Sequence, residues 1–357
     1  MVRVRDQVET PSASQIQDRL GRQRCSRVRS AAEATAIFAV VAACAYVVLL
    51  GQGAVKLTPS EVVTVLTGGG TAREIAVVWD LRLPVALATL IVGAGLGAAG
   101  AWTQTMSRNP LASPDILGVT SGASVAVVLG TVTARPAFAE AVPEFWWRAG
   151  LSLVGAAAVM VLLVLLGGVG SGTRIVLMGF ALSLMFHAAV SYLLLKAELL
   201  RAAEAQTWLA GSTGFVRADA LVPLLAGLAP FVALGAWCAR DLPLLAHDDA
   251  SAATLGVNVR ARRAALLVAA TGVSAVTVSA VGPIGFVALI APHLGRIVAR
   301  TPTPDPLVSA AAGSALLSLC AVVAGALPVA APVGAVSAVI GGIALVVLVF
   351  RATTRVS

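Results

Sequence analysis

A few polar side chains of this 357-residue sequence could do chemistry. Ser183 and His187 stand four residues apart, on one face of a helix, where a serine nucleophile and its base could meet. No oxyanion-hole glycine run accompanies them, so we expect His187 to hydrogen-bond across helices, with an intramembrane hydrolase as the enzyme alternative. His247, Asp248 and Asp249 are three adjacent residues of types that bind metal ions, but the mixed charges around them favour a solvated loop.

The positions of the acidic residues, the lack of a Walker motif and the spacing of the cysteines argue in turn against ion coupling, ATP hydrolysis and metal binding by this chain. Carboxylates inside membrane spans usually mark proton or sodium coupling, and Glu33, Asp80 and Asp219 fall before the predicted spans. No Walker motif occurs, so ATP hydrolysis is not expected. The cysteines form no C-x-x-C pair, and neither a disulfide framework, a zinc site nor a cofactor is expected. They are Cys25, Cys44, Cys238 and Cys320.

The composition is that of a polytopic helical membrane protein. The chain is 58% hydrophobic and 12% charged, with a mean hydropathy of +0.92, and a soluble chain of this length would have too little polar surface to cover itself. The net charge is +8. Its basic residues fall in loops between apolar segments, so membrane topology explains them and nucleic-acid binding is not expected.

Apolar segments of about 17–25 residues are long enough to cross a bilayer. The segment 283–298 is apolar only over a short stretch between Pro283 and Pro292, so it adds a tenth span only if so short a helix crosses. A basic arm at 1–33, with seven arginines, precedes the membrane domain at 34–350, and a tail at 351–357 follows it. The nine longer spans are expected at 34–53, 85–106, 116–133, 149–168, 175–195, 220–238, 264–281, 307–326 and 333–350.

Ten spans place both termini on the same side of the membrane. With that side cytoplasmic, 17 of the 25 lysines and arginines lie inside, as the positive-inside rule prefers. The segment 239–263 then lies inside, and its mixture of charges and short apolar groups is typical of amphipathic helices on a partner or an interface, or of a solvated loop.

The most informative stretch runs from Gly93 to Ser124. Gly93, Gly97 and Ala101 form a stripe of small residues, which lets another helix approach closely in a membrane. Pro110 forbids helix continuation, so the chain is predicted to turn at Arg108-Asn109-Pro110.

These motifs resemble the permease subunits of ATP-binding-cassette (ABC) importers for ferric siderophores, haem and cobalamin. The resemblance covers about residues 34 to 350 and leaves out the N-terminal arm. The residues that carry it are Arg82-Leu83-Pro84, Gly93 to Gly100, Gln104, the run Arg108 to Gly118, Gly122-Ala123, Leu255-Gly256, Gly282 to Val287, Pro292-His293 with Arg296, and Pro332-Val333-Gly334.

The resemblance implies an all-α fold like that of the cobalamin permease, with about ten transmembrane helices. The implied partners are a second permease subunit, two ATP-binding subunits and an extracytoplasmic substrate-binding protein. The implied cargo is a ferric siderophore, with haem or cobalamin as alternatives.

Roles of individual residues follow from the same resemblance. Leu255, Gly256 and Val257 would dock into the ATPase within the coupling loop at 239–263, and His293 and Arg296 would share in coupling. Gln104, Asn109 and Pro110 would line the translocation pathway, although a lone amide in an apolar span is also typical of an interhelical hydrogen bond.

By the same resemblance, the binding protein would dock on Arg82, because the other positions at which the family carries charged residues hold uncharged residues in this sequence. The residues at those positions are Val85, Ala321, Gly325 and Ala330. They fit either a heterodimer whose other subunit carries the fuller set or a binding protein with a different docking surface. The central motif from Ser113 to Gly118 is similar to that of one subunit of paired ferric-siderophore permeases, which favours the heterodimer.

Overall fold

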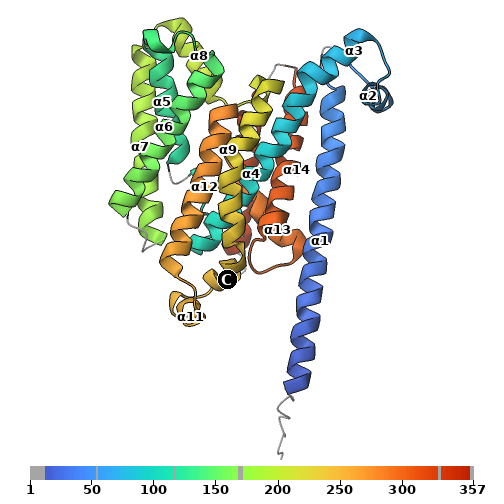
Figure 1. Cartoon of the computed structure of the whole chain (residues 1–357), viewed down its shortest axis with the longest axis vertical. Helices are drawn as coiled ribbons and strands as arrows, with labels where there is room; N and C mark the ends of the chain where they lie inside the picture. The colour runs from blue at the N-terminus through green and yellow to red at the C-terminus, as the bar shows by residue number, and fades with distance from the viewer. Residues whose placement is uncertain (1–12, 54, 116–117, 168–171, 329–330, 354–357) are drawn as a thin grey trace, which may run out of the picture.

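The computed structural model describes residues 13–53, 55–115, 118–167, 172–328 and 331–353, and every element in these residues is a helix (Figure 1). Within these described residues, seven helical segments are long and apolar enough to cross a membrane, and three shorter apolar helices accompany them. These ten segments match the ten predicted spans. Their helices are α1 (Ala13–Gly51), α4 (Leu83–Ser107), α5 (Val119–Val132), α6 (Glu144–Gly167), α7 (Gly172–Lys196), α9 (Ala218–Cys238), α12 (Val259–Val281), α13 (Val287–Ala299), α14 (Pro306–Ala326) and α15 (Val333–Thr353).

Short helices cover the two ends of the bundle, and of these the sequence indicated only helices within 239–263. One end, here called the α8 end, carries α2 (Pro59–Leu66), α3 (Ala72–Ala76) and α8 (Leu199–Leu209). The opposite end, here called the α11 end, carries α10 (Leu242–Leu245) and α11 (Asp249–Thr254). Capping boxes at Thr58 and Thr71 start α2 and α3, because each threonine accepts a hydrogen bond from a backbone amide three residues on.

Two helices extend beyond their predicted spans by more than ten residues. α1 begins at Ala13 and continues without a break into the first span, so most of the predicted arm is helical and extends past the α11 end (Figure 1). No proline interrupts the sequence between Pro11 and Pro59, and a helix already nucleated by the span can propagate. The second span forms one helical segment from Ala72 to Ser107, with a π-helical turn at Val77–Arg82 just before Pro84.

Small residues bring α4 and α14 into backbone contact at the centre of the bundle. A Cβ atom added at Gly93 would lie 2.5 Å from the carbonyl oxygen of Gly313, and one added at Gly97 would lie 2.0 Å from that of Ser309. The Ser314 hydroxyl also donates a hydrogen bond of 2.8 Å to the Leu90 carbonyl oxygen. The predicted stripe of small residues is therefore a helix-packing face.

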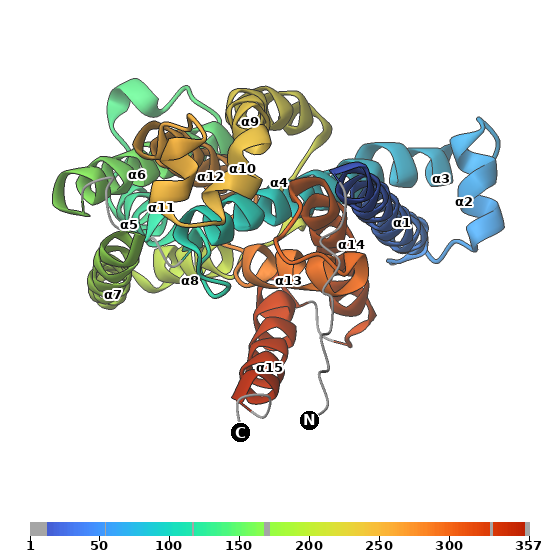
Figure 2. The ribbon, with the colours of Figure 1, turned by 90° about the horizontal axis from the view of Figure 1, so that it is seen from below.

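The membrane helices differ sharply in burial. In the most apolar 18-residue stretch of each helix, 83% of the residues of α12 are buried, but only 11% of those of α7 are. α7 and α15 project from the same side of the bundle, with α8 and α13 between them (Figure 2). The side chains that α7 and α15 expose there are mostly apolar, including Leu184 and Met185 on α7 and Val339 and Ile343 on α15.

The segment between α4 and α5 brings a carboxylate to the middle of a span. α4 ends at Arg108, which has a left-handed backbone (φ 51°), and α5 starts only at Val119 after Gly118 (φ 81°). Asp115 lines the same cavity as Ser183, which lies midway along α7. Asp115 stands just before the predicted span 116–133, but the structure places it beside the middle of α7, because α5 begins only at Val119.

Adding a methyl group to the α4–α14 contact should destabilise the protein. Gly97→Ala should lower the unfolding temperature in detergent, since overpacking a filled interface costs about 1–3 kcal/mol. Gly150→Ala is the matched control, because no atom lies within 4 Å of a Cβ added there. Equal unfolding temperatures for the two variants would contradict the packing role.

Candidate functional site

The loop between α9 and α12 folds into two short helices joined by tight turns. Asp248 caps α11 by accepting a hydrogen bond of 2.8 Å from the Ser251 amide. Asn258 caps α12 by accepting one of 3.0 Å from the Ala261 amide. Asparagine and aspartate are favoured at such caps. The charged, mixed composition of this segment therefore builds an ordered structure rather than a solvated loop.

The residues with predicted coupling roles lie in the turn after α11. Leu255 is 66% exposed although it is a large apolar side chain. Gly256 has a left-handed backbone (φ 86°), and no atom lies within 4 Å of a Cβ added there. Val257 is half-buried and packs against the main core. The turn thus presents an apolar side chain and an uncovered backbone at the surface while Val257 anchors it.

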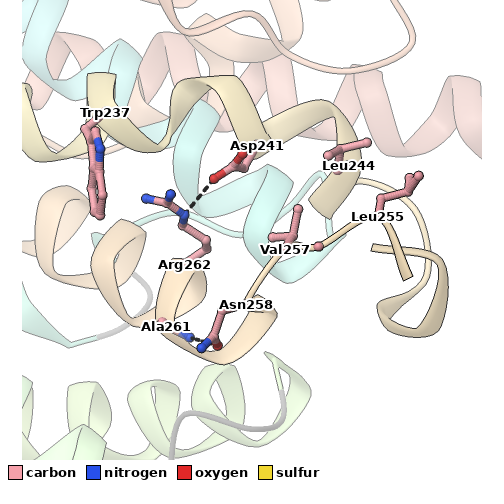
Figure 3. A pocket seen from close by; sticks show the side chains of 9 residues that line it. Trp237, Asp241, Leu244, Leu255, Val257, Asn258, Ala261 and Arg262 are labelled. Carbon is pink, nitrogen blue, oxygen red and sulfur yellow. Dashed lines mark hydrogen bonds and ion pairs between the residues drawn. The ribbon is translucent and has the colours of Figure 1, made fainter. Parts of the chain in front are cut away.

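A surface pocket of about 410 Å³ lies beside this turn (Figure 3). Leu244, Leu255 and Val257 line one side of it, and Trp237 lies at the other. Between them the Arg262 guanidinium lies 3.9 Å from the centre of the Trp237 ring and pairs with Asp241, with 2.6 Å between Nε and Oδ2. The pocket therefore offers an apolar rim with a charge pair already satisfied inside this chain.

A second charge network joins this loop to the end of α4. One oxygen of Asp249, Oδ1, accepts hydrogen bonds from Arg108 at 2.6 Å and from Arg263 at 2.8 Å, while Oδ2 accepts a second from Arg263 at 2.9 Å. Arg108 also donates from Nε to the Leu245 carbonyl oxygen at 3.0 Å. The arginine of the Arg108-Asn109-Pro110 turn thus contacts both α10 and α11.

The two arginines control the charge state of Asp249. Burial alone raises the pKa of this carboxyl, but the hydrogen bonds and charges of Arg108 and Arg263 outweigh that effect and hold the pKa below its ordinary value. The network therefore contributes at every pH above the ordinary range of an aspartate and is lost only as the pH falls through the lowered pKa.

The predicted pathway residues lie in two different settings. Gln104 is buried, and its Nε2 donates to the Leu289 carbonyl oxygen of α13 at 2.9 Å, so the structure supports the interhelical hydrogen bond. Asn109 accepts a hydrogen bond from the Leu111 amide at 2.9 Å and so forms the predicted turn with exposed Pro110 at the α11 end.

The remaining predicted site residues lie away from the loop. His293 and Arg296 are half-buried on α13, which packs against α4 and α14, and α4 lies between α13 and the α10–α11 pair (Figure 2). Arg82 was expected to face a binding protein. Its guanidinium instead donates to the Leu50 carbonyl oxygen at 2.7 Å and to that of Val55.

The Ser183 and His187 pair lacks the geometry of a nucleophile and its base. His187 Nδ1 lies 2.8 Å from the Ser183 carbonyl oxygen, and a carbonyl oxygen can only accept. Nδ1 therefore carries the hydrogen and cannot take a proton from the Ser183 hydroxyl, 3.5 Å away. The Ser183 hydroxyl instead pairs with that of Ser121 on α5 at 2.9 Å. His187 Nδ1 also lies 3.3 Å from Ser121 Oγ, which is an interhelical contact of the kind expected for His187.

Comparisons with known proteins agree with this architecture. Residues 38–351 match the model of the FecCD transport family. The chain is similar to the ferric enterobactin transport system permease protein FepG of Escherichia coli (32% identity, covering 88% of this chain and 96% of that protein). It is also similar to the iron(3+)-hydroxamate import system permease protein FhuG of Bacillus subtilis (33% identity, 86% and 93%).

A solved inward-facing structure assigned to the metal-chelate type of ABC transporter has the same fold. Its TM-score with this chain is 0.74 at 25% identity, and the match covers 89% of this chain and 98% of the other. The fold, the matched motifs and the extent of these similarities lead to one conclusion: the chain belongs to the FecCD transport family.

Proposed function

We propose that this protein is a permease subunit of an ATP-driven importer whose cargo is a ferric siderophore. The exposed turn at Leu255-Gly256, braced to α4 through Asp249, carries the proposal because it gives an ATP-binding subunit a rigid point of contact. The similar proteins FepG and FhuG, permeases for ferric enterobactin and iron(3+)-hydroxamate, support this cargo class. ATP hydrolysis would belong to the two ATP-binding subunits.

The multi-pass chain would lie in the cell membrane with the α11 end and both termini in the cytoplasm. This orientation follows the excess of lysine and arginine on that side and places the exposed turn where ATP is available. The α8 end would then face the binding protein.

The second permease subunit would pack against the side formed by α7 and α15. These helices project together and expose apolar side chains, including Leu184 and Ile343, to the outside of the chain (Figure 2). A heterodimer remains our preferred assembly, because small or apolar residues stand at charged positions of the family. Co-purification of the complex followed by identification of its subunits tests this.

Growth of a deletion strain on single iron sources tests the cargo. The strain should fail on at least one ferric siderophore and recover when the gene returns. Normal growth on every siderophore together with loss of haem or cobalamin uptake would contradict the proposed cargo and support one of those alternatives.

Replacing Gly256 should uncouple the transporter. Gly256→Val should leave the complex assembled, since a Cβ there meets no atom within 4 Å, but should abolish transport because a β-branched residue disfavours the left-handed backbone. Gly256→Asn is the matched control, since asparagine tolerates this backbone, and it should keep most of the transport. Equal transport by both variants would contradict the role of the turn.

Removing the charge of Asp249 should weaken coupling without removing α11. Asp249→Asn leaves Arg108 and Arg263 without their shared carboxylate, so transport per ATP hydrolysed should fall severalfold in reconstituted vesicles. Asp248→Asn is the neighbouring control, because asparagine also caps helices and Asp248 makes no ion pair in the described part of the chain. A normal transport ratio for Asp249→Asn would overturn the bracing role.

Arg82 should act on docking through the loop it holds rather than by direct contact. Arg82→Glu should lower capture of the binding protein, because the carbonyl oxygens of Leu50 and Val55 lose their donor. An acid-to-lysine change on the binding protein should not rescue this variant. Rescue would instead show that Arg82 itself forms the intermolecular salt bridge, and exposed Arg73 is the direct contact to compare.

A further inference from the structure

A cavity lined by several polar side chains lies between α5 and α7, apart from the loop described above. Its volume is about 380 Å³. α5 and α7 supply most of its walls, and the residues before α13 complete it. The polar side chains among its lining residues are Asp115, Thr120, Ser121, Ser124, Ser183 and His187.

Only one oxygen of the Asp115 carboxylate has a hydrogen-bond partner among the described residues. Oδ1 accepts a hydrogen bond of 3.0 Å from the Thr120 hydroxyl. Oδ2 is buried and has no partner among the described residues. An unpaired buried acceptor of this kind costs free energy, and more so when it is charged. Among the described residues, Oδ2 therefore keeps its capacity to accept a hydrogen bond.

The other polar groups of the cavity also leave acceptors available. Because His187 Nδ1 donates to the Ser183 carbonyl oxygen, the Nε2 atom of the neutral ring is an acceptor. No lysine or arginine is among the described lining residues, so no permanently charged cation faces the carboxylate there. The cavity therefore favours a ligand group that donates hydrogen bonds or carries positive charge.

The position of the cavity places these acceptors beside the proposed subunit interface. His187 is exposed on α7, the least buried of the long apolar helices, and α7 lies on the side where α15 also projects (Figure 2). A group moving between the two permease subunits would pass this wall.

We propose that Asp115, with Ser121, Ser183 and His187 around it, forms a cargo-binding site that takes a cationic or hydrogen-bond-donating group of the metal chelate in transit. The site disfavours polyanionic chelates, because their charge has the same sign as the carboxylate. This inference rests on the proposed function for the identity of the cargo, but the charged site itself can be tested without any cargo.

Thiol labelling tests the site independently of transport. The native cysteines are first replaced by serine or alanine, and Ser183→Cys is then introduced into the assembled complex. The new thiol is treated at pH 8 with a cationic or an anionic methanethiosulfonate of similar size, and the two reaction rates are compared. The cationic reagent should react faster by about tenfold or more, because a nearby carboxylate attracts it. Asp115→Asn should bring the two rates close together, while Asp219→Asn, a carboxylate at the start of α9, should not.

Uptake of three ferric chelates then tests the cargo. The panel is a neutral trihydroxamate, a trihydroxamate bearing an ammonium group and a trianionic tricatecholate, each presented with a binding protein that accepts it. Asp115→Asn should raise uptake of the tricatecholate relative to the ammonium-bearing chelate by severalfold, with the complex assembled as in the wild type.

The outcomes separate the two proposals. Absent labelling, or equal rates for both reagents in the wild type, overturns the charged site whatever the cargo. A charge preference that Asp115→Asn abolishes, with no change in relative uptake among transported chelates, overturns cargo binding there. A charge preference with no uptake of any iron chelate by the wild type overturns the proposed function and leaves the charged site standing.

Discussion

The close approach of α4 and α14 is the constraint on which the rest of the structure depends. Backbone meets backbone where Gly93 and Gly97 face Gly313 and Ser309, so no side chain can adjust the distance between these helices. α4 also packs against α12 and α13, and Gln104 ties it to α13 through the Leu289 carbonyl oxygen. A helix held on several sides in this way is a rigid frame for the segments attached to its ends.

Arg108 connects α4 to the short helices at the surface of the α11 end. This residue ends α4 and binds both the Leu245 carbonyl oxygen and the Asp249 carboxylate, while Arg263 holds the same carboxylate from α12. The turn at Leu255-Gly256 is thus braced against two core helices rather than suspended on a flexible loop. A push on that turn would be transmitted to α4 and α12 through charge-assisted hydrogen bonds.

Sequence patterns predicted the features that depend on local rules. The ten apolar segments, the packing stripe on α4 and the turn at Asn109-Pro110 all follow from hydrophobicity, residue size and backbone geometry. The sequence did not indicate the contact between Arg108 and Asp249, because it joins residues 141 positions apart. It also gave no sign that Asp115 lies at mid-depth, since that depends on where α5 begins after Gly118.

The role of single residues was harder to predict than the fold, because it depends on what each side chain meets. Arg82 matches a family motif, yet its guanidinium binds carbonyl oxygens of its own chain. Gln104 could have faced a pathway, yet it pairs with a neighbouring helix. In both cases the residue type is compatible with two roles, and the contact with a backbone carbonyl oxygen of another segment could not be predicted from the sequence.

A double-mutant cycle of Arg108→Gln and Asp249→Asn tests the central claim most directly, with transport per ATP hydrolysed as the measurement in reconstituted vesicles. Residues that act through one contact have non-additive effects. If the contact carries the coupling, Arg108→Gln lowers transport per ATP hydrolysed in the wild-type background but lowers it little further in the Asp249→Asn background. Independent effects that multiply in the double variant would show that the contact between α4 and α11 does not carry the coupling.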